Sequence, residues 1–135
     1  MSDVIIVTAS HNKNLELANE FKDELNRLGT ENEILDLIQL ALPMYTPDEE
    51  AKGLPQKVHD IVKKFEAAKG FVFVTPEYNG SIPPILSNLI AWISRSGTED
   101  WRQSFNAKPV ALGTFSGSGG IQALMFLRSQ LAYIG

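Results

Sequence analysis

Three short polar segments of the sequence carry most of the side chains that could bind a ligand: residues 8–14, 75–82 and 114–120. The first combines hydroxyl, imidazole and amide groups, which can hold an anion together with the N–H groups of a helix N-terminus. The second places an acid, an aromatic ring and an amide side by side at residues 77–79. The third is rich in Gly and Ser, and such small residues would let a flat ring lie against the backbone.

The first two segments also have plain structural interpretations. Ser10, Asn12 or Asn14 could simply cap the helix that follows, because a helix cap and a phosphate site use the same geometry. The dipeptide Asn79-Gly80 favours a tight turn by itself. Both interpretations stay open at the level of the sequence.

The third segment is similar to the nucleophile elbow Gly-x-Ser-x-Gly, but Ser116 stands where the first glycine belongs. Acyl hydrolysis would also need a histidine near the strand ends. Of the two histidines, His11 could reach that region, whereas His59 lies in the opening turns of a helix that runs away from it. Hydrolysis is therefore disfavoured, and a flat ligand against small residues is the better interpretation.

Composition and missing motifs exclude several other classes of protein. The 135 residues contain no Cys, which removes disulfides, thiolate catalysis and Cys-ligated metal sites. A net charge of −4 argues against a nucleic-acid partner, which needs a basic surface. There is no Walker P-loop, and no Gly-x-Gly-x-x-Gly follows the first strand. No apolar run approaches the about 20 residues that span a bilayer, and no secretory leader is present, so we expect a cytoplasmic protein without a membrane partner.

Strand and helix patterns alternate along the chain. Apolar residues at three- and four-residue steps predict a helix after each strand. The long stretch 40–53 is expected to be a solvated loop rather than a partner-binding segment. The second strand is weaker than the others and is placed nearer a sheet edge. Four βα units predict an α/β fold with a parallel sheet, helices on both faces and a single domain, 1–135. The predicted strands are apolar, mostly β-branched runs at residues 4–8, 33–37, 71–75 and 109–114.

The positions of the polar segments relative to the strands indicate one common site. Each of the three follows a strand directly, whereas the loops at the opposite strand ends are ordinary connections. Ligands of open parallel sheets bind beyond the carboxyl ends of the strands. We therefore expect the three segments to converge there.

Two stretches of the sequence form longer motifs. The first is Thr75-Pro76-Glu77-Tyr78-Asn79-Gly80-Ser81-Ile82-Pro83, followed by residues 86–95. The second comprises Lys108-Pro109-Val110-Ala111, the turn ending in Gly119-Gly120, and Leu127-Arg128. Both resemble the signature of the NADPH-dependent FMN reductases, flavodoxin-like flavoproteins that include azo-, chromate- and quinone-reducing enzymes. The similarity covers nearly the whole chain, and the Pro-Glu-Tyr-Asn stretch is quite specific.

The resemblance implies a flavodoxin-like three-layer sandwich with FMN at the ends of the first, third and fourth strands. It also implies hydride transfer from NAD(P)H to FMN and on to a flavin, quinone or similar small acceptor, in a homodimer and with no catalytic side chain or metal. By the same resemblance the first loop holds the phosphate, the second the isoalloxazine, and the third lines the other edge of the ring. The implied cofactor-binding residues are Thr8, Ser10, His11, Asn12 and Asn14, then Pro76, Glu77, Tyr78, Asn79 and Gly80, then Thr114, Ser116, Gly117 and Gly119.

Two positions depart from the family pattern. The family's first loop usually has the form Gly-Ser-x-Arg-x-x-Ser, and this chain lacks the Arg, so either His11 or Lys13 supplies the charge or FMN binds less tightly. Ala91 stands where the family commonly has Asp, next to Trp92, which either packs in the core or contacts the flavin. Arg95 is either a cation at a helix C-terminus or a contact to a phosphate or nicotinamide nucleotide.

Two other functions fit part of this pattern. A flavodoxin-type electron carrier would bind FMN but take its electrons from a protein partner, which the acidic composition suits. A binding or regulatory domain could have lost FMN together with the usual phosphate loop. The Pro-Glu-Tyr-Asn stretch favours the reductase over the electron carrier.

The length of the chain adds one more expectation. A flavodoxin-like sheet has five parallel strands in the order 2-1-3-4-5, whereas this sequence supplies four βα units and ends at Gly135. We therefore expect the fifth unit to be missing and the fourth strand to form an open edge. Such an edge implies lower stability or an oligomer that covers it.

Overall fold

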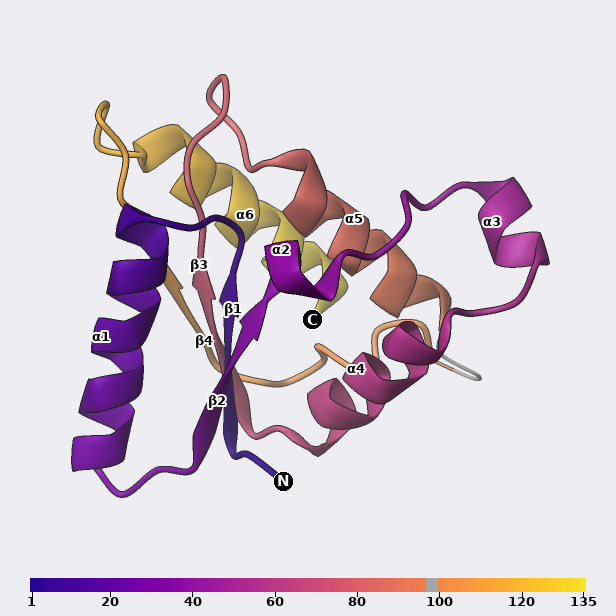
Figure 1. Cartoon of the computed structure of the whole chain (residues 1–135), viewed down its shortest axis with the longest axis horizontal. Helices are drawn as coiled ribbons and strands as arrows, with labels where there is room; N and C mark the ends of the chain where they lie inside the picture. Colours follow the sequence, from indigo (N-terminus) through magenta and orange to yellow (C-terminus); the bar gives the residue numbers. More distant parts are fainter. Residues whose placement is uncertain (97–99) are drawn as a thin grey trace.

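The computed structural model, which describes residues 1–96 and 100–135, contains a parallel sheet of four strands within those residues. The strands lie in the order β2-β1-β3-β4, so the weak second strand is at an edge, as predicted (Figure 1). The first strand has the predicted bounds, and each of the other three differs from its predicted range by one residue at both ends. Their bounds are β1 (Val4–Thr8), β2 (Asn32–Asp36), β3 (Gly70–Val74) and β4 (Val110–Gly113).

The register of the sheet brings the carboxyl ends of all four strands to one level. Thr8 pairs with Asp36 on one side and with Val74 on the other, and Val74 pairs in turn with Gly113. Since a parallel sheet points every strand the same way, the loops that follow these residues begin side by side. The predicted convergence of the three polar segments therefore follows directly from the sheet.

Helices cover both faces of the sheet, which gives the expected flavodoxin-like three-layer α/β sandwich. Figure 1 shows α1 (Lys13–Arg27) on one face of the sheet and a group of helices packed against the other face. These are α4 (Gln56–Ala67), α5 (Pro84–Arg95) and α6 (Ile121–Ile134), together with the short α2 (Leu37–Leu40). None of the helices in the described ranges is both long and apolar enough to cross a lipid bilayer.

The hydrophobic core has two parts, one on each face of the sheet. The larger part joins Phe73 and Phe71 of β3 to side chains of α4, α5 and α6, among them the fully buried Phe65, Trp92 and Leu127. The smaller part packs the opposite face of β1 and β3 against α1. All five residues of β3 are buried, which explains why its sequence is apolar without alternation.

The stretch 40–53 is more regular than the sequence analysis expected. A short helix, α3 (Pro47–Ala51), forms there because Thr46 caps it by accepting a hydrogen bond from the Glu49 N–H at 3.0 Å and Pro47 occupies its first turn. Just before this stretch, Asp36 ends β2 by capping α2 in the same way. Leu37 therefore belongs to a helix and not to the predicted strand.

Helix α5 holds the segment between α2 and α3 through two buried side chains. The Asn88 amide donates to the Pro43 carbonyl at 2.9 Å and accepts from the Tyr45 N–H at 2.7 Å. The Trp92 indole N–H donates to the same Pro43 carbonyl at 2.8 Å, and its ring is completely buried. These contacts support the packing role of Trp92. On the same helix, the Arg95 guanidinium lies 5.9 Å from the centre of the Tyr45 ring.

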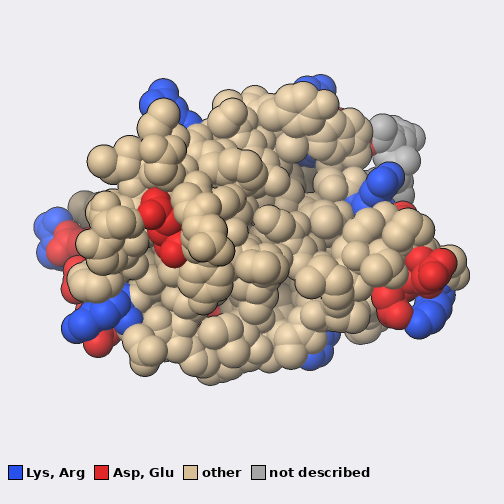
Figure 2. Space-filling model, turned by 90° about the horizontal axis from the view of Figure 1, so that it is seen from above, with Lys and Arg blue, Asp and Glu red and all other residues tan. Residues whose placement is uncertain are grey.

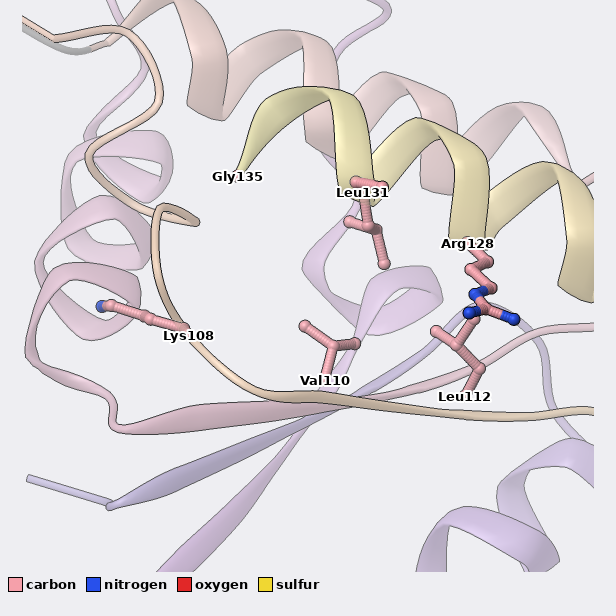
Figure 3. Close-up of a pocket in the computed structure, with 7 residues that line it drawn as sticks. Lys108, Val110, Leu112, Arg128, Leu131 and Gly135 are labelled. Carbon is pink, nitrogen blue, oxygen red and sulfur yellow. The ribbon is translucent and has the colours of Figure 1, made fainter.

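Strand β4 forms one edge of the sheet among the described residues, and its first two residues are exposed. A hollow of about 220 Å³ lies between this strand and α6. Figure 3 shows Val110 and Leu112 below it and Leu131 and Arg128 above it. Lys108 stands at its end, where its ammonium donates to the Phe65 and Glu66 carbonyls at the C-terminus of α4. Burial lowers the pKa of this ammonium group. The absence of a fifth βα unit from the protein stays a prediction.

We predict that Asn88→Ala destabilises the protein by about 1–3 kcal/mol, because the Tyr45 N–H loses its acceptor and Pro43 one of its donors. The free energy of unfolding from urea denaturation measures this. Ser87→Ala is the matched control, since Ser87 is the exposed neighbour on the same helix. Equal stability of the two variants would contradict the role assigned to Asn88.

Candidate functional site

The chain leaves the sheet at two buried threonines that bend it into the first and second loops. The hydroxyl of Thr8 donates to the Ser10 carbonyl and that of Thr75 to the Pro76 carbonyl, both at 3.0 Å. The hydrogen-bond ladder between β1 and β3 also extends one residue beyond β1, since the Ala9 N–H donates to the Val74 carbonyl at 3.0 Å. The Thr8 hydroxyl, predicted to contact a ligand, is therefore already engaged with its own loop.

The N-terminus of α1 is open toward the same edge. Asn12 precedes the helix with a positive φ of 54°, and within the described residues no side chain is bonded to the N–H groups of the first turn. The Ser10 hydroxyl instead donates a hydrogen bond to the His11 carbonyl at 3.5 Å. None of the side chains of Ser10, Asn12 and Asn14 caps α1, so the structure does not support the capping interpretation of this loop. The free N–H groups and the helix dipole leave a position where an anion is stabilised.

The buried side chain of Asn14 ties the first loop to the third. Its amide nitrogen donates to the Phe115 carbonyl at 3.1 Å, and its amide oxygen accepts from the Phe115 N–H at 2.9 Å. The two residues are 101 positions apart in the sequence. The sequence analysis proposed Asn14 as a ligand donor, whereas its amide is here occupied in holding two loops together, so its place in a ligand site stays a prediction.

His11 and Lys13 of the first loop each have a carboxylate partner. His11 Nε2 lies 3.0 Å from Asp36 Oδ2, and the other oxygen of Asp36 accepts from the N–H groups of α2. The ammonium of Lys13 lies 2.9 Å from Glu16, and this hydrogen bond raises the pKa of the exposed lysine. The partner of His11 thus lies on a different element, at the end of the neighbouring strand β2, whereas that of Lys13 lies on its own helix.

The second loop is a small hairpin that begins just after β3. Tyr78 and Ser81 exchange both backbone hydrogen bonds, at 2.8 and 3.0 Å. Asn79 and Gly80 between them have φ of 52° and 73°, the conformation that a two-residue hairpin turn requires and that Asn-Gly adopts readily. The predicted turn is confirmed, and it presents Tyr78, half of whose surface is exposed, at the carboxyl edge.

Glu77 points across the edge to the third loop. Its carboxylate accepts from the Ser118 hydroxyl at 2.6 Å and from the Ala123 N–H at 3.2 Å. These two bonds, the hydroxyl first, lower the pKa of Glu77. A lowered pKa means that the contribution of this contact to stability is present at neutral pH and is lost as the pH falls through the folded-state value.

The third loop passes so close to its own start that it needs glycine. Gly120 has a φ of 69°, and a Cβ atom there would lie 2.4 Å from the methyl group of Thr114. The hydroxyl oxygen of Thr114 is buried and has no hydrogen-bond partner among the described residues. Ser116, Gly117 and Gly119 form the outer, more accessible part of this turn.

A hollow of about 310 Å³ opens between the first and second loops. Ile38 and Ile85, which the sequence analysis did not identify, contribute apolar surface to it. Ile38 carries no sequence signal, because the position of α2 depends on tertiary contacts. Ile85, at the beginning of α5, carries no signal that distinguishes it from a packing residue. Figure 2, a view onto this edge of the molecule, shows a mainly uncharged surface whose Lys and Arg side chains lie near the rim. The hollow is lined by Ala9, Ser10, Ile38, Tyr78, Pro83, Pro84 and Ile85.

Together these features define a flavodoxin-like α/β protein whose three polar loops meet at the carboxyl edge of its sheet. The model of one protein family, the NADPH-dependent FMN reductases, matches residues 3–135. The chain belongs to this family.

Individual relatives agree with this assignment. An NAD(P)H-dependent FMN reductase of Pseudomonas aeruginosa is 37% identical over 95 residues, covering 69% of this chain and 49% of that protein. A quinone reductase of Escherichia coli K12 is 35% identical over 96 residues, again covering 69% of this chain and 49% of that protein. The structure of FerB, an NAD(P)H:acceptor flavoenzyme from Paracoccus denitrificans, superposes with a TM-score of 0.81 and 25% identity, over 100% of this chain and 73% of that one. The chain spans about half the length of the two curated relatives, the FMN reductase and the quinone reductase.

We predict that Asn14→Ala costs about 1–3 kcal/mol of stability, because it leaves both backbone groups of Phe115 unpaired. Urea unfolding monitored by fluorescence measures the loss. Asn19→Ala is the control, since the exposed Asn19 bonds only to its own helix, and we expect a change within about 0.5 kcal/mol. An Asn14→Ala protein as stable as the control would show that the contact does not hold the loops together.

Proposed function

We propose that this protein is an FMN-dependent oxidoreductase that takes hydride from NAD(P)H and passes reducing equivalents to a small acceptor such as a quinone or a flavin. The observation that carries the proposal is the open N-terminus of α1 next to an apolar hollow at the carboxyl edge. FMN joins a phosphate to a flat, uncharged ring, and this edge offers one environment suited to each. Membership of the family supports the same cofactor and reductant.

The residues present fit the phosphate of FMN. The first-turn N–H groups of α1 and the hydroxyl of Ser10 supply neutral donors, and His11, held by Asp36, supplies a cation when protonated. This arrangement takes the place of the Arg that the family usually has in this loop. Lys13 is bonded to Glu16 on the exposed side of the helix, so we assign the charge to His11.

The isoalloxazine fits against the second and third loops. Tyr78 borders the hollow. In the third loop, Gly117 and Gly119 have open space where a side chain would stand. Backbone N–H groups in these turns orient the polar rim of the ring, while the apolar residues exclude water from its face. When bound, FMN supplies the hydride-transfer chemistry, and the protein supplies its orientation and electrostatic surroundings.

A homodimer is part of the proposal. Ile121, Met125 and Phe126 lie exposed on α6, and such an apolar surface is better stabilised against a second copy of the chain than in water.

The purified protein, reconstituted with FMN, is expected to show the visible absorption bands of oxidised flavin and to lose them on anaerobic addition of NADPH or NADH. A protein that binds FMN but consumes almost no NAD(P)H would be an electron carrier instead. A colourless protein that takes up no FMN on titration would contradict the proposal outright. Riboflavin is the matched control ligand, because it lacks the phosphate, and we expect it to bind about tenfold more weakly, equivalent to ~1.4 kcal/mol.

A further inference from the structure

Glu77 differs from the other residues of the second loop in the direction of its side chain. Tyr78 stands exposed at the edge, whereas the Glu77 carboxylate lies against the third loop and the beginning of α6. One oxygen accepts from the Ser118 hydroxyl at 2.6 Å and the other from the Ala123 N–H at 3.2 Å. Both oxygens are thus bonded within the protein, 41 and 46 residues away along the chain.

This contact completes a helix end that the local sequence leaves open. Helix α6 is preceded by Gly120, which has no side chain to cap it. Glu77 acts as the cap from a different element, and a carboxylate at this position also balances the positive end of the helix dipole. Helix α6 is therefore neutralised by a protein side chain, whereas α1, which begins at the same edge, is left open.

The turn that Glu77 holds has little side-chain packing of its own. It is rich in glycine, with Gly119 and Gly120 at positive φ, and its internal bonds run between Ser116 and its close neighbours. Its connections to the other two loops, within the described residues, are the Asn14–Phe115 pair at its start and the Glu77–Ser118 bond at its tip. The tip thus depends on Glu77 for its position.

We propose that Glu77 is a positioning residue for the flavin: its carboxylate fastens the tip of the third loop to the second loop and neutralises the N-terminus of α6 beside the ring. The proposal rests on the function proposed above. In this arrangement the backbone groups of the two loops face one ligand at a fixed separation, and the anionic phosphate is directed to α1 rather than to α6.

Glu77→Gln tests this role, because it keeps the size of the side chain but removes its charge and one of its two acceptors. We expect FMN to bind about tenfold more weakly in a fluorescence titration. The midpoint potential of the bound flavin should become more positive, since a negative charge is lost and a helix N-terminus is released. Amide hydrogen exchange of the protein without FMN should accelerate at residues 118–123.

Two further variants separate position from charge. Ser118→Ala retains the carboxylate and should weaken FMN binding severalfold with an unchanged potential. Glu31→Gln makes the same charge change just before β2, at the opposite edge of the sheet, and should alter neither quantity.

Wild-type affinity and potential in Glu77→Gln would overturn the proposal, and so would a lower thermal stability with the potential unchanged. If the wild-type protein itself takes up no FMN, the proposed function fails and this role fails with it. If the wild-type protein binds FMN and Glu77→Gln binds it equally well, the proposed function stands and only the role of Glu77 is rejected.

Discussion

The parallel pairing of β1 with both β2 and β3 is the constraint on which the rest of the structure depends. It sets Thr8 level with Asp36 and Val74. The pairing of β3 with β4 then sets Val74 level with Gly113, so that every following loop starts at one edge. The buried apolar side chains of these strands stabilise that pairing from both faces. A shift of one strand by a single residue would turn its core side chains to the opposite face and separate the loops.

Side chains then hold the loops that the sheet brings together. Asn14 bonds to the backbone of the third loop, Glu77 joins the second loop to the third, and His11 is held at the end of β2 by Asp36. Each connection links segments that are far apart in the sequence. The result is an edge that is organised before any ligand arrives, so that less ordering entropy is lost on binding. The N-terminus of α1 stays open at this edge.

Much of the fold could be predicted from the sequence, because continuous apolar runs and three- to four-residue periodicity reflect local rules. The hairpin at Asn79-Gly80 was predictable for the same reason, since that dipeptide favours positive φ. The roles of Asn14 and Glu77 were not, because their bonding partners are set by tertiary structure and carry no local signal. Helix α3 was missed although Thr46 and Pro47 form a recognisable start, because a helix of five residues has almost no periodicity.

The most direct test of the account is a map of the FMN-binding surface by NMR, using the amide resonances of the ¹⁵N-labelled protein during titration. The account predicts saturable shifts that concentrate in residues 8–14, 75–82 and 114–120, with those of the first turn of α1 lost when riboflavin replaces FMN. Shifts centred on the hollow between β4 and α6, near Lys108 and Arg128, would contradict it, as would a titration without saturation.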